Sequence, residues 1–117
     1  MAQPAPNAEE GVEKLVEEYQ SVQEQLRSFA ALLNQLQNQK EEIERAKQEI
    51  QASSGKIYLN VGGIMVETTK EKALSDLDNR DEMLRLRITS STKQYNELKE
   101  KEKKLAEQLT QLYKSQD

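Results

Sequence analysis

Apolar residues recur along two long stretches of the chain at alternating steps of three and four positions. In the first stretch they are Val12, Leu15, Tyr19, Val22, Leu26, Phe29, Leu33, Leu36, Ile43 and Ile50. In the second they are Leu74, Leu77, Leu84, Ile88, Tyr95, Leu98, Leu105, Leu109 and Leu112. A mean spacing of about 3.5 residues is typical of coiled-coil helices. The pattern therefore predicts two helices, at about 9–54 and about 69–115.

The two apolar stripes match each other when the second helix runs antiparallel to the first. The resulting layers pair Ile50 with Leu74, Leu36 with Ile88, Phe29 with Tyr95, and Leu15 with Leu109. The midpoint of each pair falls at Gly62, within a Gly-Gly pair that the heptads do not define. We therefore expect one chain folded back on itself. A parallel dimer would leave the segment between the helices without an evident purpose.

Polar residues interrupt the predicted seam at Lys40 and Lys47 in the first helix and at Asp81, Ser91 and Glu102 in the second. The antiparallel register places Asp81 opposite Ile43, between the layers of the two lysines. One hypothesis is that Asp81 helps to fix the register. The alternative is that a two-helix seam is half wet and the lysines extend their ammonium groups into water.

The segment IYLNVGGIMVETT, between the helices, is rich in β-branched and aliphatic residues and predicts a β-hairpin at about 57–67. Its turn centres on Val61-Gly62 or on Gly62-Gly63, and both choices give the same two faces. One face carries Ile57, Leu59, Val61, Ile64 and Val66, and the other carries Tyr58, Asn60, Met65 and Glu67.

A lone two-stranded hairpin is marginally stable in water, and both of its edges have unpaired backbone groups. We therefore expect this hairpin to pair with hairpins of other subunits into a sheet or barrel. The predicted assembly residues are Ile57, Tyr58, Leu59, Val61, Gly62, Gly63, Ile64, Met65 and Val66. Met83 and Leu86 fall at outer heptad positions, so we expect them to pack against this hub or a neighbouring subunit.

Local signals set the predicted boundaries. Residues 1–8 contain both prolines and predict a disordered tail before a single domain at 9–117. Gly55 is expected to end the first helix in a left-handed conformation. Thr68 and Glu71 have the spacing of a capping box that would begin the second helix.

Composition narrows the possible functions. The formal net charge is −4, and 17 basic and 21 acidic residues are interleaved, which argues against a basic surface for nucleic acid. The chain has no Cys and no His, so the commonest metal ligands and general base are absent. No apolar run is long enough to span a membrane. We expect a cytoplasmic protein that is not an enzyme and needs no cofactor or metal.

The segment IYLNVGGIMVETTKEKALSDL resembles the β-class, single-hairpin signature of the prefoldin family. The shared features are an aromatic residue in the first strand, a V-G-x turn, an aliphatic second strand, and a helix start with Thr and Lys. The two-helix architecture extends the resemblance to nearly the whole chain. The longer insertion of the α class, with two hairpins, is absent.

The resemblance implies a mainly α fold, an antiparallel two-helix coiled coil whose hairpin joins a β-barrel hub. It implies a hexamer of two α-class and four β-class subunits that holds unfolded polypeptides without ATP and delivers them to a group II chaperonin. Client contacts would lie at the helix tips, at Val12, Leu15, Val16, Tyr19, Val22, Leu105, Leu109, Leu112 and Tyr113. The alternative function is a structural coiled-coil adaptor or scaffold without client binding.

Overall fold

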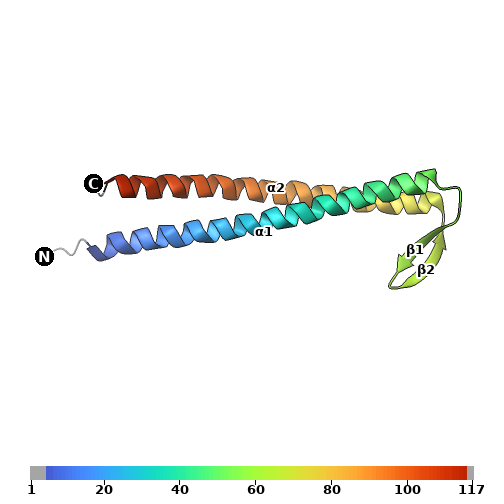
Figure 1. The fold of residues 1–117 in the computed structure, drawn as a ribbon, viewed down its shortest axis with the longest axis horizontal. Coiled ribbons are helices and arrows are strands. Elements are labelled where there is room, and N and C mark those ends of the chain that lie inside the picture. The colour runs from blue at the N-terminus through green and yellow to red at the C-terminus, as the bar shows by residue number, and fades with distance from the viewer. Residues whose placement is uncertain (1–4, 116–117) are drawn as a thin grey trace. The chain divides into compact units, whose positions relative to one another are not determined.

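The computed structural model describes residues 5–115, with side chains from residue 10 onward. Helix α1 (Ala5–Ala52) is followed by strands β1 (Ile57–Val61) and β2 (Ile64–Thr68) and by helix α2 (Lys70–Ser115) (Figure 1). Two compact units result. The residues up to Leu32 and from Ser91 onward form the terminal unit, and Leu33–Ser90 form the hairpin unit. Each unit contains part of both helices.

Helix α1 begins four residues earlier than the sequence predicts, at Ala5 rather than at residue 9. Residues 1–4 of the predicted disordered tail lie outside the described residues, but residues 5–8 are helical. Proline is tolerated in the first turn of a helix, because the N–H that it lacks has no partner there in any case. Pro6 is therefore compatible with this earlier start.

The terminal unit is held together by side chains from both helices. Val22 and Leu26 of α1 form a buried cluster with Leu105 of α2. The partly buried residues packed against this cluster are Leu15, Tyr19, Tyr95 and Leu98. The register that pairs Phe29 with Tyr95 also pairs Tyr19 with Leu105 and Leu26 with Leu98, and these last four residues all belong to the cluster or pack against it. The seam predicted from the heptads is confirmed here.

In the hairpin unit, the seam buries Leu36 of α1 and Leu84 of α2, which are 1% and 8% exposed. Both belong to the predicted apolar stripes. Burying a leucine side chain stabilises a fold by about 1.5–3 kcal/mol. Asp81 is also buried at a seam position, with 7% of its surface exposed.

Strands β1 and β2 form an antiparallel hairpin in which Val61 pairs with Ile64 and Leu59 with Val66. The turn is therefore Gly62-Gly63, the second of the two predicted choices. Their φ angles are +56° and +87°. A tight two-residue turn of this kind favours glycine because both positions have positive φ. The Asn60 side-chain oxygen accepts a hydrogen bond from the Gly63 N–H at 3.2 Å.

The end of α1 differs from the prediction. The helix stops at Ala52, and Gly55 does not have a positive φ. The Lys70 ammonium group instead donates hydrogen bonds to the backbone carbonyls of Gln51 at 2.7 Å and Ser53 at 3.3 Å. These bonds satisfy carbonyls at the end of α1 that have no partner within the helix. A left-handed residue is therefore not needed at Gly55.

The start of α2 is also shifted by one residue. Thr68 is the last residue of β2, where it pairs with Ile57, so it is not free to cap the helix. Thr69 takes that place, and its hydroxyl accepts a hydrogen bond from the Lys72 N–H at 3.1 Å. The capping box predicted for Thr68 and Glu71 is therefore wrong, because strand pairing uses the first of these residues.

Candidate functional site

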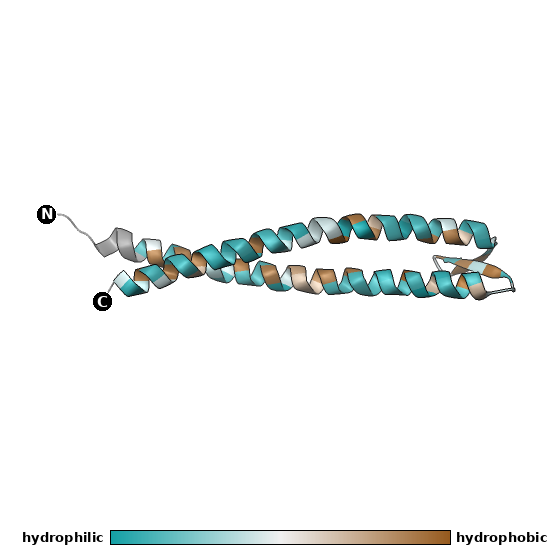
Figure 2. Cartoon of the chain, turned by 90° about the horizontal axis from the view of Figure 1, so that it is seen from above, coloured by the Kyte–Doolittle hydropathy of each residue, from teal (hydrophilic) through white to brown (hydrophobic). Residues whose placement is uncertain are grey.

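The hairpin is the most extensive exposed apolar surface in the described part of the chain. No residue of either strand is fully buried, and the exposed side chains include Val61 at 56%, Ile64 at 68% and Met65 at 62%. Figure 2 shows apolar colouring along the hairpin and mostly hydrophilic colouring, with apolar residues interspersed, along the helices. A surface of this kind marks an interaction site.

The pairing of the strands confirms the two predicted faces of the hairpin. Leu59, Val61, Ile64 and Val66 share one face, because directly paired residues point to the same side of a sheet. Tyr58 and Met65 lie on the other face. All nine predicted assembly residues lie in β1, the turn or β2, and all except the partly buried Ile57 are exposed.

The second candidate surface is the tip, formed by the start of α1 and the end of α2 in the terminal unit. An open groove of about 910 Å³ lies there. It is lined by Leu15, Lys104, Glu107, Gln108, Gln111, Leu112 and Ser115. The groove combines two leucines with a polar rim, which suits a shallow contact with an apolar segment.

The predicted tip residues differ in accessibility. Tyr113 is 65% exposed, whereas Val22 and Leu105 are buried in the cluster between the helices. These two could contact a client only if the helices separated. The remaining members are partly buried, namely Val12, Leu15, Val16, Tyr19, Leu109 and Leu112.

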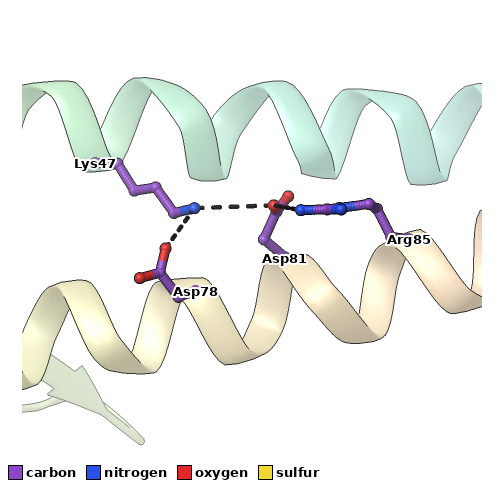
Figure 3. A network of polar contacts seen from close by, with 4 residues as sticks. All are labelled: Lys47, Asp78, Asp81 and Arg85. Atoms are coloured by element: carbon purple, nitrogen blue, oxygen red, sulfur yellow. Dashed lines mark ion pairs between the residues drawn. The ribbon is translucent and has the colours of Figure 1, made fainter.

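A polar network crosses the seam of the hairpin unit (Figure 3). The Lys47 ammonium group lies 2.7 Å from an oxygen of Asp78 and 3.8 Å from an oxygen of Asp81. Arg85 lies 3.8 Å from the same Asp81 oxygen. The other Asp81 carboxylate oxygen is buried and has no hydrogen-bond partner among the described residues.

The hydrogen bond with Asp78 and the negative charges around Lys47 raise the pKa of this lysine above its ordinary value of 10.5. Lys47 is therefore a cation at physiological pH. Because Asp81 is buried in the seam, we interpret the network as a contact that stabilises the pairing of α1 with α2. Lys47 turns toward two aspartates across the seam, which fits the register hypothesis better than free extension into water.

The described residues contain no cluster of three or more His, Cys, Asp or Glu side chains that could hold a metal ion. None of the helices in this part of the chain is long and apolar enough to cross a membrane.

Sequence reasoning located the hairpin but missed three hydrogen bonds that support it. The bonds from Lys70 to the end of α1 join residues 19 and 17 positions apart, so no local pattern indicates them. The bond from the Gly63 N–H to the Asn60 side-chain oxygen is local, and an Asn two residues before a Gly-Gly turn could have predicted it.

Comparison with known proteins gives a consistent result. The family model described as "Prefoldin subunit" matches residues 13–116. Prefoldin subunit beta of Methanosarcina acetivorans is 31% identical over 102 residues, covering 86% of this chain and 87% of that protein. Prefoldin subunit beta of Pyrococcus furiosus is 33% identical over 98 residues, covering 84% and 80%.

A solved structure also matches. The crystal structure of the prefoldin beta subunit from Thermococcus strain KS-1 superposes with a TM-score of 0.82. The sequences are 28% identical, and the match covers 96% of each chain. The order of elements, two long helices with one hairpin between them, agrees with the single-hairpin signature in the sequence. The chain therefore belongs to the prefoldin family of chaperone subunits, as a member of its β class.

Proposed function

We propose that this chain is one of four β-class subunits that assemble with two α-class subunits into an ATP-independent holdase. The hexamer captures unfolded polypeptides at the helix tips and delivers them to a group II chaperonin. The observation that carries the proposal is the uncovered hairpin, which has exposed apolar side chains on both faces. Hairpins of neighbouring subunits would cover these faces and pair the free strand edges.

The tip groove supports client capture. Leu15 and Leu112 line it, and the exposed Tyr113 lies on the same last turns of α2. Each tip offers only a small apolar surface, so a single subunit would bind a client weakly. Several tips on one hub would hold it much more tightly, because each further contact is made at a high effective concentration.

Delivery to a group II chaperonin and location in the cytoplasm are parts of the proposal that rest on family membership. Transfer is tested by loading the hexamer with a fluorescent unfolded client and adding a group II chaperonin. We expect the label to move to the chaperonin fraction. Label that stays with the hexamer would contradict delivery without affecting capture.

The holdase function is tested by the aggregation of a chemically denatured client, followed by light scattering without nucleotide. Complexes of the full chain with its α-class subunit should suppress aggregation. Replacing Ile57–Val66 by a short turn should abolish assembly and suppression, while circular dichroism still reports most of the helix. Suppression by this unassembled variant would contradict the multivalent mechanism.

Client contact at the tip is tested by Tyr113→Ser, with Lys114→Ser as the matched control on the same exposed turn. The tyrosine change should weaken suppression of aggregation several-fold and leave the hexamer intact, because Tyr113 is 65% exposed. The lysine change should have little effect. Equal suppression by both variants would remove Tyr113 from the client surface.

The adaptor alternative makes a different prediction. A structural coiled coil would assemble through its hairpin but would not reduce client aggregation at any molar ratio. An assembled hexamer without suppression would therefore favour the adaptor and contradict the holdase.

A further inference from the structure

Two large apolar side chains lie on the outside of the hairpin unit, away from its seam. Met83 and Leu86 of α2 are 67% and 68% exposed. Residues three apart lie on one face of a helix, so these two form a single surface, which we call the outer patch. The seam residues of the same stretch, Asp81 and Leu84, are buried. The outer patch therefore has no role in pairing α1 with α2.

The rim of the outer patch carries charges of both signs, and Arg87 is its one cation without an ion-pair partner among the described residues. Arg80 and Arg87 lie three residues before and four residues after Met83, and both are exposed. Arg80 pairs with Asp76 at 3.2 Å, whereas no carboxylate lies within ion-pair distance of Arg87 among the described residues. Glu82 lies on the opposite flank, one turn before Leu86. A partner should offer an apolar centre and an acidic group for Arg87.

The hairpin has a face with this composition. Tyr58 and Met65, 49% and 62% exposed, lie on the face opposite the aliphatic one. Glu67 pairs directly with Tyr58 across the strands and is the only charged residue in β1 or β2. We call this face, which also carries Asn60, the second hairpin face. Its apolar side chains suit the apolar centre of the outer patch, and the negative charge of Glu67 is opposite to that of Arg87.

Within one chain, the outer patch and the second hairpin face do not cover each other, because both stay exposed. The two surfaces are different, so their contact between copies would be head-to-tail, and it can form wherever two β-class copies are neighbours in the hexamer. The aliphatic hairpin face remains free for the hub. The contact thus extends the assembly surface without competing with it.

We propose that the second hairpin face of one β-class copy packs against the outer patch of a neighbouring copy, with Glu67 facing Arg87. The proposal rests on the hub assembly proposed above and adds a second contact to it. A few side chains bury far less than a standard interface of about 1,600 Å². The contact therefore orients neighbouring arms and does not by itself hold the hexamer together.

Cysteine cross-linking tests the contact directly, because the chain has no native cysteine. Copies carrying Met65→Cys are mixed with copies carrying Leu86→Cys and assembled with the α-class subunit. Oxidation should give a disulfide-linked dimer of two β-class chains. The matched control carries Ile64→Cys in place of Met65→Cys. Ile64 is similarly exposed but lies on the aliphatic face. We expect several-fold less cross-linked dimer in the control.

The outcomes separate the two proposals. A hexamer that forms, but gives no more disulfide between positions 65 and 86 than the control pair gives, overturns the contact and leaves the proposed function standing. Failure of wild-type chains to form any complex overturns both.

As a second readout, Arg87→Glu should weaken hexamer stability against dilution, and adding Glu67→Arg should restore it. No restoration would contradict the pairing of these two residues.

Discussion

Among single residues, Asp81 is where the seam departs most from an apolar interface. Its carboxylate is buried, yet its two cationic neighbours, Lys47 and Arg85, are both 3.8 Å away and one oxygen has no partner among the described residues. A buried charge with distant partners costs more desolvation than its pairing returns. What such a residue can supply is specificity, because a slipped register would remove Lys47 from its reach.

Replacing this acid should therefore increase stability. We expect Asp81→Leu to raise the free energy of unfolding by about 1 kcal/mol, the low end of the gain for whole buried ion pairs replaced by apolar residues, because Lys47 remains and keeps its 2.7 Å contact with Asp78. Urea denaturation followed by circular dichroism measures the change. Unchanged stability and assembly would favour the half-wet seam, and a loss of stability would mean that the ion pairs outweigh the desolvation of Asp81.

Lys47→Met should act in the opposite direction. It removes the 2.7 Å contact with Asp78 and the nearest cation across the seam from Asp81, so we expect a lower midpoint of unfolding. The raised pKa of Lys47 gives this effect a pH dependence. The contribution is fully present below the ordinary pKa of 10.5 and is lost as pH rises through the higher folded value.

The measurement is the difference between wild-type and Lys47→Met unfolding midpoints across pH. The difference should stay constant between neutral pH and about pH 9, and shrink above 10.5. Ser54→Ala, at an exposed position after α1, serves as a control without such a trend. A difference that grew at high pH would contradict the assignment of charge to Lys47.

Among the elements, the hairpin depends on a turn in which two consecutive residues have positive φ. Gly62 and Gly63 have φ of +56° and +87°, and nothing lies within 4 Å of a Cβ added at either position. The restriction is therefore in the backbone and not in the space around it. Asn tolerates the first of these conformations, whereas β-branched residues do not.

We expect Gly63→Val to destabilise the turn by roughly 1–2 kcal/mol, the usual cost of a left-handed conformation in an ordinary residue. Hexamer formation, measured by sedimentation velocity, should shift to higher subunit concentration. Gly62→Asn is the matched control and should assemble like the wild type. Normal assembly of Gly63→Val would show that the hub tolerates another turn.

The elements differ in how far sequence alone could predict them. Heptad spacing correctly identified the seam, because every buried leucine and valine occupies a predicted stripe position. Alternation identified both hairpin faces. Helix ends were less predictable: Lys70 caps α1 from beyond the hairpin, and pairing of Thr68 with Ile57 moves the cap of α2 to Thr69. Such ends depend on contacts between distant segments.

The same limit applies to the candidate site. The sequence predicted which residues are apolar at the tip, but a stripe does not distinguish those that face the partner helix from those that remain accessible. Packing decides this, since Leu105 is buried between the helices while Tyr113 is 65% exposed. Heptad position indicated the exposure of Met83 and Leu86, but their pairing with a second surface required the strand register.

For the molecule as a whole, exposed apolar surface is concentrated where assembly is proposed. The large apolar side chains that stay exposed in the described residues lie in the hairpin and the outer patch, with Tyr113 at the tip as the exception. A monomer would leave nearly all of this surface in water. The distribution predicts that partners cover the hairpin unit, while the tip stays available to clients.

Native mass spectrometry of this chain, purified from its own cells with its bound subunits, would show whether the hairpin builds a hub. We expect a hexamer with four β-class chains and two longer α-class chains. When Ile57–Val66 are replaced by a short turn, the mass spectrum should contain no hexamer. A wild-type monomer or simple homodimer without further subunits would contradict the hub and leave the exposed hairpin without an occupant.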